Sequence, residues 1–152
     1  MAKKQEENGF SALKQSLKTG ELGRLYIFSG EESYLRMHYL SECKKAIIGD
    51  SPFAEFNLFE FDGKSMSPDQ LRDAIESYPA MAEHKLVIVH DFDLYKMPAA
   101  FSEFLPALLA DLPEYICLIF HYDVIECKPD KRLKIHQVLS KAGTFVSFEH
   151  LD

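Results

Sequence analysis

The chain has 152 residues, of which 47% are hydrophobic, 27% charged and 12% aromatic, and its formal net charge at pH 7 is −7. A chain of this length buries about 68–70% of the surface that it exposes when unfolded, so one domain can fold without disulfides or a structural metal. The composition excludes a disordered, collagen-like or coiled-coil chain. The acidic balance argues against a surface whose main task is binding nucleic acid phosphates, because that binding depends on Lys and Arg.

The three cysteines, Cys43, Cys117 and Cys127, are an odd number without CxxC spacing, and each lies in or beside an apolar run. This pattern is typical of buried thiols in a reducing compartment. The N-terminal residues lack the apolar segment of a secretory signal, and no stretch is apolar for long enough to span a membrane. We therefore expect a soluble, cytoplasmic protein without a membrane partner.

Helix-like and strand-like stretches alternate along the chain, after a short helix expected over residues 11–17 that ends near Gly20. The strands are predicted at 25–28, 57–61, 85–89, 115–120 and 144–148. The intervening helices show apolar stripes at Leu35, Tyr39, Cys43 and Ile47, at Phe101, Phe104, Leu105 and Leu108, and at Ile135, Val138, Leu139 and Ala142. Pro106 either kinks its helix or starts a separate turn, and Gly143 closes the last helix as a C′ residue. This order predicts a three-layer α/β domain, with helices on both faces of a mostly parallel five-stranded sheet.

The clearest helix start lies after the second predicted strand. Ser67 is a good N-cap, Pro68 suits the first helical position, and Gln70 completes a capping box. The apolar stripe of this helix is Leu71, Ala74, Ile75 and Tyr78. Pro79 is expected to end the helix.

The loop after the first strand resembles a degenerate phosphate loop. Gly30 fits the first glycine of the GxxxxGK[ST] template. The positions of the second glycine, the lysine and the hydroxyl residue hold Leu35, Arg36 and Met37. Glu31 and Glu32 stand where the helix N-terminus would otherwise attract a phosphate, so the loop is more consistent with a structural turn than with nucleotide binding.

Acidic and histidine side chains follow the third and fourth predicted strands, where neighbouring strand ends converge. His90, Asp91, Asp93, His121 and Asp123 are of the types that bind metals. The alternative is that they cap helices and stay solvated, as such residues commonly do at strand ends. A small metal- or nucleotide-dependent enzyme that uses these acids is therefore a second hypothesis.

The strongest basic cluster consists of Lys128, Lys131, Arg132 and Lys134. No aromatic residues are interleaved with it, as base stacking would require. We favour a solvated helix start over a nucleic-acid or partner surface.

The segment Tyr78-Pro79-Ala80-Met81-Ala82 places apolar residues in a connection between helix and strand, where polar residues are the norm. Two interpretations remain open. Met81 either packs under the loop into the core, or it is an exposed anchor for a partner.

Several segments in the same order and spacing resemble one family, the delta subunit of bacterial DNA polymerase III, which opens the sliding clamp. They are 17–22, 25–35, 61–63, the helix ending at Pro79 before 86–89, 130–134 and 143–145. Gly-Glu-Glu-x-Tyr-Leu at 30–35 is the most specific of these. The resemblance spans nearly the whole chain.

This resemblance implies an AAA+-type fold in a subunit that binds no ATP, has no cofactor or metal, and carries no catalytic residue. It also implies that the domain binds the clamp through an apolar wedge at the helix end before the third strand, usually with two large side chains in sequence. Tyr78, Pro79, Ala80 and Met81 occupy this region, and Ala80 and Met81 match the two wedge positions. The pattern is thus half kept.

The resemblance further implies that residues 1–152 are the N-terminal clamp-binding domain of a longer subunit whose lid and collar domains are absent here. Its partners would be the sliding clamp (beta subunit), primed DNA within the assembly and, mainly through the collar, the gamma/tau and delta prime subunits. The chain would then belong to a DNA-directed DNA polymerase, a nucleotidyltransferase complex, without being catalytic itself. A free-standing α/β adaptor with another partner is the third hypothesis.

Overall fold

The computed structural model describes residues 2–50 and 52–149, with side chains described from residue 9 onward in these ranges. The strands are β1 (Leu25–Ser29), β2 (Leu58–Asp62), β3 (Lys85–His90), β4 (Ile116–His121) and β5 (Thr144–Ser147). They form a five-stranded sheet in the order β2-β3-β4-β1-β5, and every neighbouring pair is parallel. The predicted α/β architecture is confirmed.

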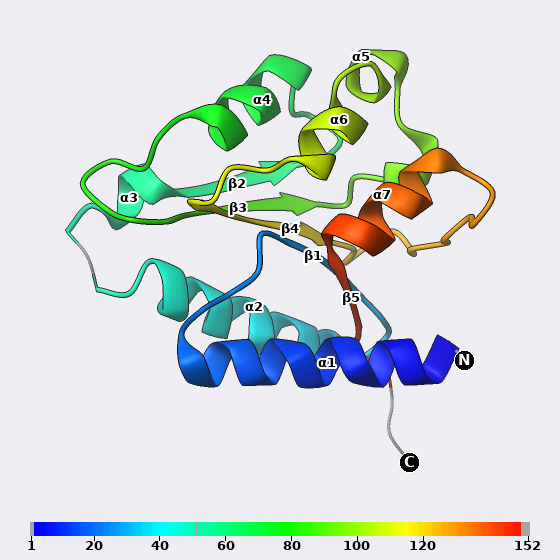
Figure 1. Ribbon diagram of the computed structural model, residues 1–152, viewed down its shortest axis with the longest axis horizontal. Coiled ribbons are helices and arrows are strands. Elements are labelled where there is room, and N and C mark those ends of the chain that lie inside the picture. The colour runs from blue at the N-terminus through cyan, green and yellow to red at the C-terminus, as the bar shows by residue number, and fades with distance from the viewer. Residues whose placement is uncertain (1, 51, 150–152) are drawn as a thin grey trace.

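Helices cover both faces of this sheet (Figure 1). They are α1 (Ala2–Thr19), α2 (Ser33–Ile47), α3 (Ala54–Asn57), α4 (Pro68–Glu76), α5 (Ala99–Ser102), α6 (Leu105–Ala110) and α7 (Lys134–Ala142), with a 3-10 turn at Leu94–Lys96. Helices α1 and α2 lie on one face, and α4, α5, α6 and α7 lie on the other. Of the helices in the described ranges, none combines the length and apolar character needed to cross a bilayer.

The alternation of side chains along each strand divides the core into two halves. Leu25 and Ile27 of β1 pack in the cluster that includes the apolar faces of α4, α6 and α7. Tyr26 and Phe28, which point the other way, pack in the cluster that includes residues of α1 and α2. Because both faces are covered, β3 and β4 are buried along almost their whole length, as continuous apolar strands of parallel sheets are.

The capping box at the start of α4 is confirmed. The Ser67 hydroxyl oxygen accepts a hydrogen bond from the backbone N–H of Gln70 at 3.1 Å, and the Gln70 side-chain oxygen accepts one from the backbone N–H of Ser67 at 2.8 Å. Two N–H groups that the helix leaves unpaired are thereby satisfied, which typically stabilises a protein by about 1 kcal/mol.

Three helix boundaries differ from the prediction. Helix α1 covers 18 residues rather than the short stretch over 11–17, because its N-terminal half is polar and shows no apolar stripe. Asn57 ends α3 instead of starting a strand, and its side chain is buried. Helix α4 stops at Glu76, so Tyr78 does not join its apolar stripe; the residue before a proline is biased away from helical backbone.

Pro106 and Gly143 both lie at helix termini, Pro106 at the start of α6 and Gly143 at the end of α7. Pro106 lies in the first turn of α6, which is separate from α5, so the second of the two predicted alternatives is correct. Gly143 does close α7, but as the C-cap and with extended backbone (φ −125°) rather than as a left-handed C′ residue. Its role is packing, because a Cβ atom there would lie 2.8 Å from Cγ of Leu25.

Candidate functional site

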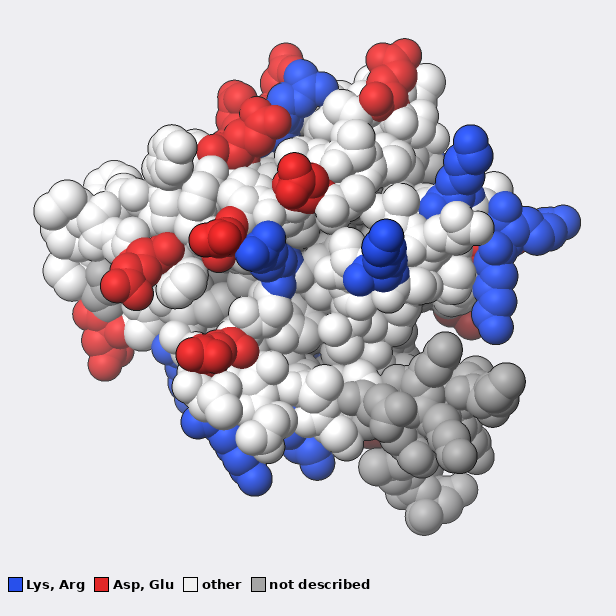
Figure 2. All heavy atoms as spheres, viewed as in Figure 1, with Lys and Arg blue, Asp and Glu red and all other residues white. Residues whose placement is uncertain are grey.

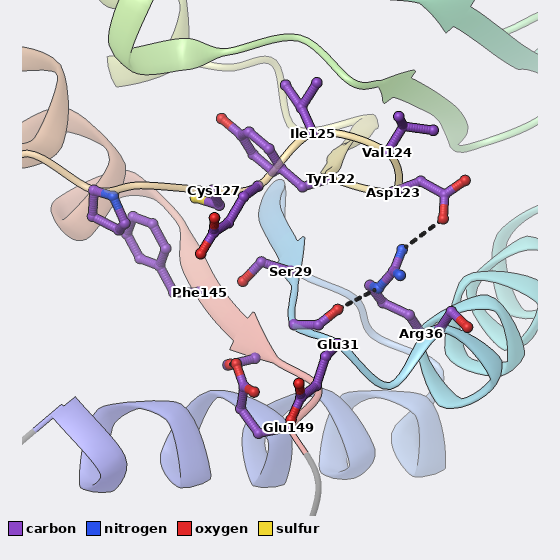
Figure 3. Close-up of a pocket in the computed structure, with 15 residues that line it drawn as sticks. Ser29, Glu31, Arg36, Tyr122, Asp123, Val124, Ile125, Cys127, Phe145 and Glu149 are labelled. Atoms are coloured by element: carbon purple, nitrogen blue, oxygen red, sulfur yellow. Dashed lines mark hydrogen bonds and ion pairs between the residues drawn. The ribbon is translucent and has the colours of Figure 1, made fainter.

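An open cavity of about 580 Å³ lies at the carboxyl ends of β1, β4 and β5 (Figure 3). Open α/β sheets bind ligands at this edge. The cavity lining includes four carboxylate residues, Glu31, Asp123, Glu126 and Glu149, together with Arg36. This balance is unfavourable for an anionic ligand, provided that the charge of Arg36 is already neutralised within the protein.

The loop at residues 29–33 uses its backbone groups to bind the end of β5. Gly30 has φ +109°, and a Cβ atom there would lie 2.5 Å from the carbonyl oxygen of Phe148. The N–H of Glu32 donates to that same oxygen at 2.9 Å, and the N–H of Ser33 donates to the carbonyl of Glu31 at 2.9 Å. In a phosphate loop, N–H groups of this segment would face the ligand. Here two of them, the N–H groups of Glu32 and Ser33, are hydrogen-bonded within the protein.

Arg36 stands at the template position of the phosphate-binding lysine, but its side chain is only 3% exposed. Its Nε donates to the Gly30 carbonyl at 3.0 Å, and one terminal nitrogen donates to Nε2 of His121 at 2.8 Å and to Oδ1 of Asp123 at 3.1 Å. Figure 3 shows the guanidinium of Arg36 pointing toward the Asp123 carboxylate. The guanidinium of Arg36 therefore binds the loop after β1 and the C-terminal end of β4, and its charge is paired with Asp123.

The contact with Arg36 fixes the proton of His121. A guanidinium can only donate, so Nε2 of His121 must accept and the ring proton lies on Nδ1. Nδ1 then donates to Nδ1 of His90, which lies 2.9 Å away. Burial, followed by the positive charge of Arg36 and by His90, lowers the pKa of His121 to about 4. The imidazole is neutral at pH 7 and connects β3, β4 and α2.

Asp91 organises the loop after β4. Its backbone has φ +56°, and its Oδ1 accepts the N–H groups of Asp123, Val124 and Ile125 at 2.8, 2.8 and 3.1 Å. Burial alone raises the pKa of Asp91, but these three hydrogen bonds and the proximity of His121 outweigh it and hold the pKa below its ordinary value. The Asp91 carboxylate thus holds the loop at residues 123–125 by accepting its backbone N–H groups.

The strand-end residues do not assemble into the hypothesised metal site. His90 and His121 bind each other, Asp91 binds backbone N–H groups, Asp123 pairs with Arg36, and Asp93 caps the 3-10 turn by accepting the N–H of residue 95. Across residues 2–50 and 52–149, no three His, Cys, Asp or Glu side chains are placed to hold a metal ion. These contacts argue against the metal-site hypothesis, because a buried guanidinium lies among these groups and the acids bind Arg36 or backbone N–H groups of the loops.

The basic cluster before α7 is solvated. Arg132 makes two hydrogen bonds of 3.0 Å with the carboxylate of Asp130, and Lys128 lies 4.0 Å from Glu126. Figure 2 shows basic side chains at the margin of the molecule where α7 lies in Figure 1, and acidic side chains over α4 and α5. Because acidic neighbours partly neutralise the cluster, the solvated helix start that we favoured agrees with the structure.

The apolar segment before β3 lies at the opposite edge of the sheet from the cavity. Tyr78 is 84% exposed and Met81 is 78% exposed. Met81 adopts φ +53°, a left-handed conformation that is rare for residues other than glycine and costs about 1–2 kcal/mol. Of the two interpretations, the one in which Met81 packs into the core is wrong.

A buried amide fixes the backbone next to Met81. The side chain of Asn57, 2% exposed, donates from Nδ2 to the carbonyl of Ala80 at 2.8 Å and accepts the N–H of Ala80 at Oδ1 at 2.7 Å. Its second amide hydrogen points to the carbonyl of Phe53 at 3.2 Å. Helix α3 and the segment before β3 are therefore joined through one side chain.

A buried lysine holds the other end of the same segment. Nζ of Lys85, at the start of β3, donates to the carbonyl and, at 2.9 Å, to the hydroxyl oxygen of Ser77, the C-cap of α4. The hydroxyl of Tyr115 donates to the preceding carbonyl, that of Glu76. Burial lowers the pKa of Lys85 to about 8. The Lys85 ammonium and the Tyr115 hydroxyl thus satisfy carbonyl groups that the end of α4 leaves unpaired.

Three residues of this region were not singled out from the sequence. The sequence places Asn57 and Lys85 at the starts of predicted strands, and it gives no signal for Phe56, which is 62% exposed. A lysine at the start of an otherwise aliphatic strand was the one available signal, because a fully buried lysine requires a specific partner.

The parallel sheet, its strand order and the helices on both faces give the chain an AAA+-like α/β fold. The chain superimposes on a gamma-subunit-related DNA polymerase III protein of Thermotoga maritima with a TM-score of 0.63, at 20% identity, covering 92% of this chain and 46% of that one. A RuvB mutant of Thermotoga maritima gives a TM-score of 0.52 at 12% identity, covering 96% of this chain and 45% of that chain. These two likenesses concern the fold alone.

Two further comparisons identify the family. A family model described as "DNA polymerase III, delta subunit" matches residues 26–149, and this chain belongs to that family. DNA polymerase III subunit delta of Bacillus subtilis is 36% identical over 75 residues, which are 49% of this chain and 21% of that protein. The solved Bacillus subtilis DNA clamp loader delta protein superimposes with a TM-score of 0.78 at 25% identity, covering 94% of this chain and 43% of that chain. The chain thus spans less than half the length of these relatives.

Proposed function

We propose that this chain is a sliding-clamp-binding domain of a clamp-loader delta subunit, and that it binds the clamp through the segment Tyr78–Met81. It acts as an interaction domain without ATP and without a catalytic residue. The observation that carries the proposal is the exposed, left-handed Met81. It lies in the segment Tyr78–Met81, called the tip below, whose backbone is held by the buried side chains of Asn57 and Lys85. Membership of the delta family supplies the partner.

The tip has the form of an apolar wedge with one large side chain. Ala80 is small and its backbone is bound to Asn57, so Met81 projects alone from the two wedge positions. The ring of Tyr78 packs against that of Tyr115, with the ring centroids 5.3 Å apart, and remains 84% exposed. Phe56, which precedes Asn57, is a further exposed apolar side chain at this edge and a candidate for the second contact.

Clamp opening follows if the tip binds an opened ring better than a closed one. A ligand shifts a conformational equilibrium only by its difference in affinity for the two states. Fully burying one Met side chain is worth about 1.5–3 kcal/mol, so Met81 alone supplies a factor of about 10 to 150 in affinity. Met81 therefore biases the equilibrium to the extent that it is buried more fully against the opened ring than against the closed one.

Alanine substitutions in the full chain test the wedge by titration against the purified sliding clamp (beta subunit). We expect Met81→Ala to weaken binding about tenfold or more and Tyr78→Ala to weaken it less. Met37→Ala is the matched control, because Met37 is also exposed but lies on α2, in the loop-to-helix region after β1. Unchanged affinity for both Met81→Ala and Tyr78→Ala would show that the wedge assignment is wrong.

The nucleotide-dependent alternative is tested by thermal unfolding with ATP and magnesium. A ligand at a hundred times its dissociation constant stabilises by about 2.7 kcal/mol. We expect no shift, since the N–H groups of Glu32 and Ser33 and the side chain of Arg36 are already hydrogen-bonded within the protein. A clear ATP-dependent shift would contradict the proposal.

The remaining partners follow from the family alone. Contacts with the gamma/tau and delta prime subunits, expected mainly through a collar domain, and with primed DNA within the DNA polymerase III holoenzyme belong to the same proposal. The cytoplasm is the compartment that fits this assembly.

A further inference from the structure

We propose that Asn57 is a positioning residue for clamp binding: its side-chain amide fixes the backbone of Ala80 and so keeps Met81 in its projecting, left-handed conformation before the clamp arrives. This inference rests on the proposed function, and it assigns the role of holding the wedge to a residue of α3, which lies outside the segment 78–81. Asn57 itself is buried, so it acts through Met81 and does not contact the partner.

The amide of Asn57 is suited to this role because its three hydrogen bonds leave it one orientation. Oδ1 receives the Ala80 N–H at 2.7 Å, while Nδ2 reaches the Ala80 carbonyl at 2.8 Å and the Phe53 carbonyl at 3.2 Å. A flipped amide would place donor against donor and acceptor against acceptor. Both backbone groups of Ala80 are thus held by a single rigid side chain.

Met81 needs such an anchor because its own backbone conformation is unfavourable. With φ +53°, a side chain larger than hydrogen crowds the following carbonyl, and such residues persist only where the surroundings hold them. The chain is fixed on both sides of Met81, by Asn57 at residue 80 and by the start of β3 at Lys85. The unfavourable backbone conformation of Met81 is therefore already maintained in the protein without its partner.

A tip held in this way loses little conformational freedom on binding. Ordering a mobile residue at an interface is unfavourable, and a binding segment that is already in its bound conformation avoids that loss. Releasing Ala80 and Met81 from Asn57 should therefore weaken clamp binding about tenfold, even though every atom that touches the clamp remains.

A double-mutant cycle on the full chain separates positioning from general stability. Clamp affinity is measured for wild type, Asn57→Ala, Met81→Ala and the double variant. We expect Asn57→Ala to weaken binding about tenfold when Met81 is present and less than twofold when residue 81 is alanine, because residues that act as a unit are non-additive. Ser67→Ala, which removes the side-chain acceptor of a backbone N–H at the far end of α4, is the matched control and should leave affinity unchanged.

Asn57→Asp provides a second variant of nearly the same shape. It still accepts the Ala80 N–H but turns an oxygen toward the Ala80 carbonyl, so it should also weaken binding about tenfold through Met81. Hydrogen exchange at the Ala80 N–H adds a local readout, with faster exchange expected in Asn57→Ala than in Ser67→Ala.

The outcomes distinguish this inference from the proposed function. If Met81→Ala weakens binding and neither Asn57 variant does, or if Asn57→Ala weakens binding equally in both backgrounds, Asn57 does not position Met81. If Met81→Ala leaves affinity unchanged, Met81 is not a clamp contact and this inference is overturned. The wedge assignment itself is wrong only if Tyr78→Ala also leaves affinity unchanged.

Discussion

The neutral histidine between β3 and β4 makes the fold sensitive to mild acid. His121 is buried, and protonation would turn a donor toward the guanidinium of Arg36, so its pKa falls from 6.5 to about 4. A group whose folded pKa is below its unfolded value takes up a proton only on unfolding in the interval between the two values. Stability is therefore full above pH 6.5 and is lost as the pH falls toward 4.

The magnitude follows from the size of this shift. The difference between 6.5 and about 4 corresponds to at most about 3 kcal/mol, and about 2 kcal/mol of it is lost between pH 7 and pH 5. Replacing His121 with Gln keeps an acceptor for Arg36 and a donor for His90 while removing the titration. We expect the free energy of unfolding of His121→Gln to fall by about 2 kcal/mol less than that of wild type over this pH interval.

Urea unfolding at a series of pH values measures this difference. Other titrating groups are present in both proteins and cancel in the comparison. His38→Gln, on the exposed surface of α2, controls for the loss of a histidine as such. If wild type and His121→Gln lose equal stability between pH 7 and pH 5, His121 is not the neutral link that the geometry indicates.

Three further predictions concern the loop, the packing and the thiols. Arg36→Lys, which restores the phosphate-loop residue, should lower the free energy of unfolding by about 1–3 kcal/mol, because one ammonium cannot make the contacts of the guanidinium. It should create no ATP-dependent thermal shift, and ATP-dependent stabilisation would refute the closed-loop account. Gly63→Ala should destabilise by about 1–3 kcal/mol in chemical denaturation, because its Cβ atom would lie 2.7 Å from Cα of residue 92; a neutral effect would mean that the backbone there can shift. Burial raises the pKa of Cys43 to about 12 and of Cys127 to about 11 and raises that of Cys117, so all three should react slowly with a thiol reagent at pH 8 until urea is added; fast labelling of Cys43 or Cys117 in the native protein would contradict their burial.

The sequence predicted the elements whose signals are local. The capping box of Ser67 and Gln70 and the unbroken apolar runs of β3 and β4 lead directly to α4 and to the covered, parallel sheet. The failure of the phosphate loop was also visible, because Leu35 and Arg36 replace required chemistry.

Contacts between distant segments could not be predicted in this way. Asn57 lies 23 positions before Ala80, and nothing in its neighbourhood indicates that its amide will hold that backbone. The partnership of Arg36 with His121, 85 positions apart, likewise arises only when α2 packs beside β4. This partnership also argues against the hypothesised metal site, because it places a cation beside His121 and Asp123.

The most direct test of clamp binding by this tip is hydrogen exchange of the full chain with and without the purified sliding clamp. The account predicts that the clamp slows exchange at the amide groups of residues 77–82 and leaves residues 29–36 unchanged, since these two segments lie at opposite edges of the sheet. Protection confined to 29–36, or no protection at 77–82 under conditions where the clamp is bound, would contradict it.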